Sequence, residues 1–187
     1  TPSFAMDIHN NDIKSMVDDF IEVDFTVSNT RVYRNRGYNG RNGISLAPIF
    51  GGPCYVFRNE LYNMDISAFK MNRGTSGMVI VHNSSSKAGN GMSSDGWQNT
   101  FIKNNVIVGS KYCFEEYGLV NGSTDDWDYN AYKSTRNATL GQEWFKWDNV
   151  RYGDLNELQT GTNIETNGIE FDQNTDIVDV AFPATDD

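Results

Sequence analysis

The sequence predicts an all-β protein, a right-handed parallel β-helix in which the chain forms a single-stranded solenoid of about 24 residues per coil with a C-terminal cap. Three observations predict it. One asparagine recurs at near-constant spacing, a short segment of alternating apolar and polar residues follows each asparagine, and no linker interrupts residues 8–125. Short strands of this kind cannot bury their apolar faces alone, but stacked coils can.

The asparagine repeat sets the period. A β-branched or aromatic residue stands three positions before each recurring asparagine, and the asparagines are separated by 24, 24, 24, 22 and 25 residues. Asparagine tolerates the left-handed backbone of a sharp corner, and its amide can bond to the corner of the neighbouring coil. We therefore expect an inward asparagine ladder made of Asn11, Asn35, Asn59, Asn83, Asn105 and Asn130.

A second strand follows each asparagine after a turn that contains glycine or asparagine. Its first and third places are mostly large and apolar and its second and fourth mostly polar, which is typical of a strand with one buried face. The segments are 21–24, 44–47, 69–72, 92–95, 114–117 and 145–148. We expect equivalent places in successive coils to form columns along the axis of the stack.

The segment Asp18-Asp19-Phe20-Ile21-Glu22-Val23-Asp24, the repeat and the asparagine column resemble right-handed parallel β-helix proteins of the pectate-lyase-like superfamily, over residues 8–148. That superfamily is rich in polysaccharide lyases, glycoside hydrolases and epimerases. The resemblance implies a carbohydrate-active protein that acts on or binds an extracellular polysaccharide or oligosaccharide, with a polysaccharide lyase favoured. The motifs specify architecture better than activity.

The chain is predicted to be one domain, with β-helix coils in residues 1–125 and the last coil and a capping segment in residues 126–187. A solenoid must shield its last coil from water and from edge pairing. Residues 153–158 are expected to form a short helix within the cap. Trp144 and Trp147 fit core packing, and the alternative is an aromatic patch that binds carbohydrate.

Composition limits the partners. The 187 residues carry a formal charge of −10, which excludes nucleic acid and an anionic membrane surface as preferred partners. No apolar run approaches a membrane span, and residues 1–7 lack the features of a signal peptide. We expect a monomer, extracellular or periplasmic, in a processed form or as a fragment. Cys54 and Cys113 are expected to be unbridged, and Ca²⁺ is left open as a cofactor.

The outward columns hold the candidate site. The second place of the later strand gives Glu22, Ser45, Lys70, Ser93, Glu115 and Lys146, and the fourth gives Asp24, Ala47, Asn72, Asp95, Tyr117 and Asp148. The predicted catalytic residues are Lys70, Tyr117, Asp95 and Glu115. The predicted substrate-binding residues are Asn72, Arg73, Glu22 and Asp24. The alternative is a solvated face of interspersed charge.

Two chemistries suit this face. β-Elimination of a uronate polymer needs a base and a cation that offsets the developing charge, and Lys70 or Tyr117 could act as base with Arg73 or Ca²⁺ as stabiliser. An electrostatic role suits Lys70 better, which makes Tyr117 the preferred base. Hydrolysis needs two flanking carboxyl groups, and the available pairs are Glu22 with Asp24 and Asp95 with Glu115. No diagnostic lyase or hydrolase motif decides between them.

A second column precedes the asparagine ladder and could bind anions, since it contains Arg34, Arg58, His82, Asn104 and Tyr129. Surface arginines alone would give the same pattern. Two further functions stay open beside the enzyme: a non-catalytic carbohydrate-binding or structural module, and a fragment of a larger β-helix enzyme. The shape of the outward columns, a groove or a bare face, would discriminate between them.

Overall fold

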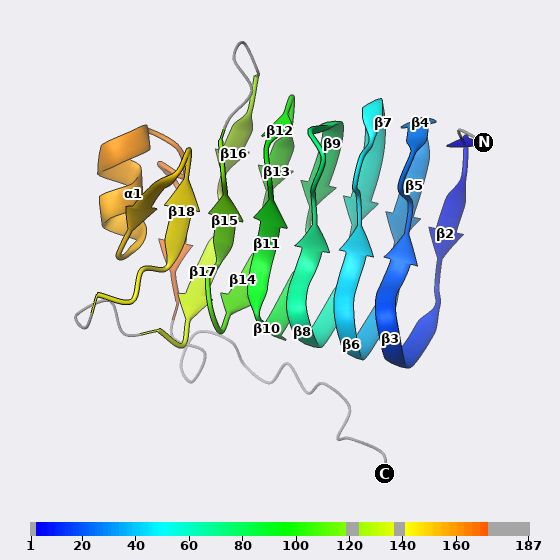
Figure 1. Ribbon diagram of the computed structural model, residues 1–187, viewed down its shortest axis with the longest axis horizontal. Coiled ribbons are helices and arrows are strands. Elements are labelled where there is room, and N and C mark those ends of the chain that lie inside the picture. The colour runs from blue at the N-terminus through cyan, green and yellow to red at the C-terminus, as the bar shows by residue number, and fades with distance from the viewer. Residues whose placement is uncertain (1–2, 119–123, 137–140, 172–187) are drawn as a thin grey trace.

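The computed structural model describes residues 3–118, 124–136 and 141–171, which wind into a parallel β-solenoid of about five turns. The coils stack along one axis, as the side-by-side strands in Figure 1 show. Strands separated by one coil in sequence are hydrogen-bonded neighbours, so the backbone polar groups are satisfied between coils. The parallel β-helix predicted from the repeat is therefore confirmed.

One wall of the solenoid is a parallel sheet formed by the strands that precede each ladder asparagine. These strands are β2 (Asp7–His9), β5 (Thr30–Tyr33), β7 (Phe50–Phe57), β9 (Thr75–Val81), β12 (Trp97–Gln98), β13 (Phe101–Lys103) and β16 (Asp126–Asp128). Beside this wall lies a small parallel pair, β1 (Ser3–Phe4) with β4 (Thr26–Ser28).

The second sheet contains the strands that follow the asparagines. In the first three coils it consists of long strands, β3 (Asp12–Glu22), β6 (Arg36–Ser45) and β8 (Glu60–Lys70). In later coils two shorter strands replace each long strand: β10 (Ser84–Ala88) with β11 (Asn90–Ser94), β14 (Val106–Gly109) with β15 (Phe114–Glu116), and β17 (Ala131–Ser134) with β18 (Phe145–Trp147). The sheet ends with β19 (Val150–Tyr152), which pairs with β18, and β20 (Ile169–Glu170), which pairs with β17. The register of β3 against β6 shifts between Met16 and Asp19, and that of β6 against β8 shifts between Gly40 and Asn42.

The core consists of inward columns from both sheets. One column holds Val32, Val56, Ile80, Ile102 and Trp127, and another holds Ile44, Phe69, Met92, Phe114 and Phe145, all at most 2% exposed. Trp144 and Trp147 are buried, and Trp147 contacts the rings of Trp97, Phe114 and Trp127. The expectation of core packing for these tryptophans is confirmed. Cys54 and Cys113 are free and buried, as expected.

The asparagine ladder has the predicted direction and residues. The backbone N–H and the Nδ2 of each ladder asparagine donate to the Oδ1 of the next, at 2.8 to 3.2 Å, from Asn11 through to Asn130. One detail differs from expectation. The left-handed residue at each corner is the one before the asparagine, with φ of 54° at Arg34 and 57° at Arg58. This placement lets the asparagine turn both its N–H and its amide toward the next coil.

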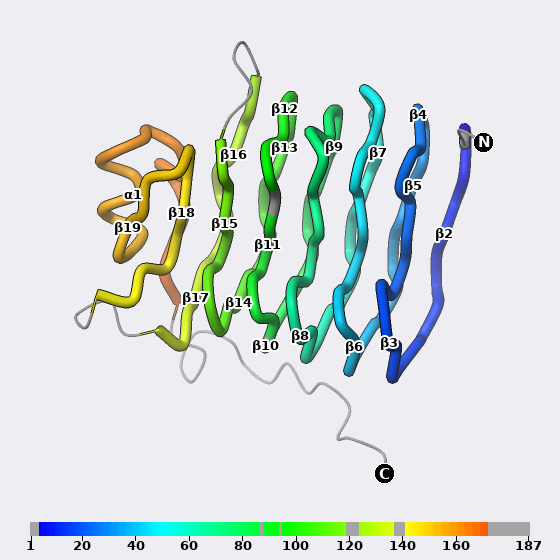
Figure 2. The backbone as a smooth tube through the Cα atoms, viewed as in Figure 1, coloured from blue at the N-terminus to red at the C-terminus, as the bar shows by residue number. Residues whose placement is uncertain are grey.

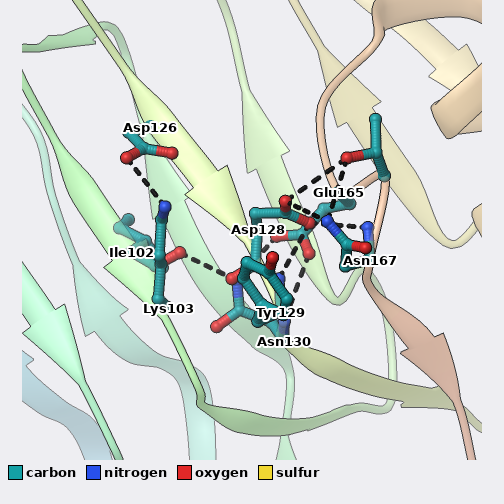
Figure 3. A network of polar contacts seen from close by, with 9 residues as sticks. Ile102, Lys103, Asp126, Asp128, Tyr129, Asn130, Glu165 and Asn167 are labelled. Carbon is teal, nitrogen blue, oxygen red and sulfur yellow. Dashed lines mark hydrogen bonds and ion pairs between the residues drawn. The ribbon is translucent and has the colours of Figure 1, made fainter.

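The last coil ends the ladder with a carboxylate instead of an amide. Glu165, fully buried, accepts from the Asn130 Nδ2 at 2.6 Å, the Asn130 N–H at 3.3 Å and the Tyr132 hydroxyl at 2.7 Å. Figure 3 shows Glu165 beside Asn130, with Asp128 and Asn167 holding the adjoining segment. Burial raises the pKa of Glu165 to about 7 against the opposing hydrogen bonds.

The helix α1 (Leu155–Thr162) and the antiparallel pair β18–β19 lie at the C-terminal end of the stack. In Figure 1 the helix lies beyond β18. Leu155 and Leu158 bury their side chains in the core. The Asp154 side chain caps the helix by accepting from the Glu157 N–H at 2.8 Å. The expected helix is present, shifted toward the C-terminus. The part of the predicted cap in residues 172–187 lies outside the described residues.

In the described part of the chain, no helix has the length and apolar character needed to cross a membrane.

Candidate functional site

The second-place column has the register expected from the period, but Ser45, Glu115 and Lys146 in it are buried and not outward as expected. Glu22 pairs with Ser45, Ser45 with Lys70, Lys70 with Ser93, Ser93 with Glu115, and Glu115 with Lys146. These residues come from β3, β6, β8, β11, β15 and β18, whose backbones lie side by side along the stack in Figure 2. The structure therefore brings the column together, but it divides its polar groups into two clusters.

The first cluster is centred on an ion pair. The Lys70 Nζ lies 2.7 Å from the Asp19 Oδ2, and the side chains of these residues are 29% and 5% exposed. The carboxylate of this ion pair is nearly buried, and the ammonium is partly exposed. Asp19 was not among the predicted site residues. It lies two coils before Lys70, on the opposite side from Asp95 and Glu115, which lie in later coils.

A short buried polar ladder supports the Asp19 carboxylate. The Asn42 Nδ2 donates to the Asp19 Oδ1 at 2.8 Å, and the Ser67 hydroxyl donates to the Asn42 Oδ1 at 3.0 Å. Asn42 and Ser67 are buried, and the three residues are register partners in β3, β6 and β8. This ladder fixes the carboxylate that in turn fixes the Lys70 ammonium.

A pocket of about 230 Å³ opens beside this ion pair, and we name it the Lys70 pocket. It is lined by Asp18, Arg41, Asn42, Ile66, Ser67, Lys70, Asn72 and Ser93. The Oδ1 of Asn72 is buried and has no hydrogen-bond partner among the described residues. A buried acceptor without a donor costs free energy, and Asn72, which carries this acceptor, lines the pocket.

The carboxylates of Glu22 and Asp24 lie next to each other at the first coils. The Asp24 Oδ1 accepts from the Ser45 hydroxyl and the Ala47 N–H, both at 2.7 Å. The negative charge of Asp24 raises the pKa of Glu22, and burial and the charge of Asp19 raise it further. The side chains of Glu22 and Asp24 also share a hydrogen bond. A glycosidase pair must leave room for a glycosidic bond between its carboxyl groups, and this contact does not.

The second cluster is formed around Glu115. Its carboxylate accepts from the Tyr117 hydroxyl at 2.7 Å and from the Asn90 Nδ2 at 2.8 Å, and the Lys146 Nζ lies 3.6 Å from the centre of the Tyr117 ring. Burial and the hydrogen bond to Glu115 raise the pKa of Tyr117 to about 12. Phenolate is scarce at neutral pH under these conditions, which disfavours the free protein's Tyr117 as a base.

Asp95 and Arg73 lie at an exposed corner between the two clusters. The Asp95 Oδ1 accepts from the Arg73 backbone N–H at 2.5 Å, and Arg73 has a left-handed backbone with φ of 67°. Neither residue lines the Lys70 pocket. Of the eight predicted site residues, the pocket therefore contains Lys70 and Asn72.

Metal chemistry has little support in the described ranges. No three His, Cys, Asp or Glu side chains there converge in a way that could hold a metal ion. Hard cations such as Ca²⁺ require several oxygen ligands. The carboxylates of Asp19, Asp24 and Glu115 are instead bonded to Lys70, Ser45 and Tyr117.

No known protein family, curated protein or solved structure gives a match to this chain. The geometry of the chain's own residues is therefore what indicates its function. The arrangement that can recognise a ligand is the Lys70 pocket, which is lined by Lys70, Arg41 and Asn72, the residue with the unpaired amide oxygen.

Proposed function

We propose that this protein is a carbohydrate-active β-helix protein that binds an acidic polysaccharide or oligosaccharide in the Lys70 pocket. One observation carries the proposal. Asn72, whose buried Oδ1 has no donor among the described residues, lines the same pocket as Lys70. A saccharide that carries both hydroxyl and carboxylate groups fits this pair of requirements.

Each pocket group has a matching group on a uronate sugar. A sugar hydroxyl can donate to the Asn72 Oδ1, which removes the cost of a buried unpaired acceptor. The Lys70 ammonium has three N–H donors and uses one on Asp19, so the others can bind a sugar carboxylate. The exposed Arg41 at the pocket adds a second cation, although the whole chain carries a charge of −10.

Polysaccharide lyase activity is a second candidate, favoured by the fixed position of the Lys70 charge. β-Elimination builds negative charge on the uronate carboxylate, and a cation held in place by Asp19 could stabilise it. The candidate base is Tyr117, whose raised pKa weighs against that role until a substrate displaces Glu115. Binding without turnover, in a separate module or in part of a larger enzyme, is therefore the first proposal, with an extracellular or periplasmic location.

The Asn72→Ala variant is expected to lose affinity for oligogalacturonate by at least about tenfold while its melting temperature stays the same or rises, because the substitution removes an unpaired acceptor. A Lys70→Met/Asp19→Asn double variant should lose at least as much without leaving a buried charge unpaired. Isothermal titration calorimetry measures both affinities. Ultraviolet absorbance of unsaturated products tests for lyase turnover in the same samples.

The matched control is Asn156→Ala, which makes the same change at an exposed position of α1, far from the pocket in the stack. It should bind like the wild type. A neutral oligosaccharide of equal length should bind at least about tenfold more weakly than oligogalacturonate. Wild-type affinity in both pocket variants would contradict the proposal.

A further inference from the structure

A second pocket lies at the corner before the asparagine ladder, and we name it the corner pocket. Its volume is about 400 Å³, and it is lined by Asn10, Asn11, Asp12, Arg34, Asn35, Arg36, Arg58 and Glu60. It shares no lining residue with the Lys70 pocket. It is therefore a separate place at which a ligand can bind the first three coils.

The charges of the corner pocket are only partly balanced. Arg36 lies between two carboxylates, 3.5 Å from Asp12 and 3.4 Å from Glu60. The guanidinium groups of Arg34 and Arg58 are exposed and have no ion pair or hydrogen bond with any described residue. Three arginines against two carboxylates leave a net charge of +1 at the pocket of an acidic protein.

The corner itself does not require arginine. Arg34 and Arg58 have φ of 54° and 57°, and in other coils Asn10 and Asn104 occupy the same left-handed place at 57° and 56°. Asparagine adopts this backbone at lower cost than arginine does. Two arginines in adjacent coils lie about one strand spacing apart, roughly 4.8 Å, so their charges repel unless an anion is bound.

We propose that Arg34 and Arg58 form a second binding site, in which two unpaired guanidinium groups one coil apart take two neighbouring acidic groups of a saccharide. The planar guanidinium binds oxyanions with two parallel hydrogen bonds, so carboxylate and sulfate groups share the required chemistry. The polar Asn10 and Asn11 at the pocket can bind sugar hydroxyls. This site does not depend on ligand binding in the Lys70 pocket.

A short ligand that cannot reach from one pocket to the other separates the two sites. Calorimetric titration of the wild type with digalacturonate and with a sulfated heparin disaccharide is expected to show binding at the corner pocket by at least one of them. The Arg34→Gln/Arg58→Gln variant should lose at least about tenfold in affinity at that site, because both charge-assisted contacts are removed. The ligand that responds identifies carboxylate or sulfate as the acidic group.

Two comparisons keep this result distinct from the proposed function. The Asn72→Ala variant should retain the site that the arginine variant loses, whether or not the Lys70 pocket binds. Lys14→Gln removes an exposed positive charge outside both pockets and should change the affinity less than about twofold. Equal binding of both disaccharides by the arginine variant and the wild type, or no binding by either, would overturn the proposal.

Discussion

Replacing Asn59 with alanine is expected to lower the free energy of unfolding by about 3 to 5 kcal/mol, because several buried hydrogen bonds are lost at one position. The Asn59 Oδ1 accepts from the Asn35 N–H at 3.1 Å and from the Asn35 Nδ2 at 3.0 Å. The Asn59 Nδ2 donates to the Val32 carbonyl and the Asn83 Oδ1, both at 3.0 Å. Urea unfolding followed by circular dichroism measures the loss.

The control for this change lies in the same coil. Asn63 is exposed, and its Nδ2 donates to the Asn39 Oδ1 at 2.7 Å, so the loss of this bond should cost no more than about 1 kcal/mol. The left-handed backbone of Asn63, with φ of 56°, adds about 1 kcal/mol when alanine replaces it. If Asn59→Ala unfolded at the same urea concentration as Asn63→Ala, the inward ladder would have no special energetic role. Because Asn63→Ala also carries the cost of a left-handed alanine, the difference between the two variants is a lower bound on the contribution of the buried hydrogen bonds.

Glu165 is expected to make the protein less stable as the pH rises from about 4.5 to about 7, by about 3 kcal/mol over that range. Its pKa is raised in the folded state, so the folded protein holds this proton more tightly than the unfolded chain. The associated stability is complete below the unfolded pKa of 4.5 and is lost as the pH passes through the folded pKa near 7. Other carboxylates act in the opposite direction, including Asp128, whose pKa is lowered by hydrogen bonds from Asn167 that outweigh burial.

The Glu165→Gln variant separates this effect from the other titrating groups. Glutamine cannot ionise, and it retains an oxygen that can accept from Tyr132 and Asn130. Urea unfolding at several pH values should show the variant gaining about 3 kcal/mol relative to the wild type between pH 4.5 and pH 7. A constant difference across that range would mean that Glu165 does not titrate there.

The sequence period predicts the fold in detail because a solenoid converts sequence spacing directly into strand register. The column from Glu22 to Lys146 follows from alignment of the repeats, and the observed pairing agrees with it at every step. The end of the ladder was not predictable in this way. Glu165 has a different side chain from the ladder asparagines and stands 35 residues after Asn130, so no repeat pattern indicates it.

The candidate site was only partly predictable, for a physical reason. Lys70 and Asn72 could be predicted because they occupy the second and fourth places of one repeated strand segment. Asp19, which positions Lys70, stands outside these repeated places. Asp19 lies 51 residues from Lys70 in sequence, and the long lysine side chain reaches it across two coils. Its support comes from Asn42 and Ser67, which look like ordinary turn residues in the sequence. The only sequence signal for Asp19 was its place in an acidic strand segment.

The most direct test of carbohydrate recognition is an amide chemical-shift titration of the wild-type protein with oligogalacturonate. The proposed function predicts saturable shifts at Lys70, Asn72 and Ser93, which line the Lys70 pocket, and at Asn42 behind it. Amides of α1 should stay unchanged, because the helix lies at the far end of the stack (Figure 1). Saturable shifts that leave Lys70, Asn72 and Ser93 unaffected, or the absence of any shift at ligand concentrations well above those of the protein, would contradict it.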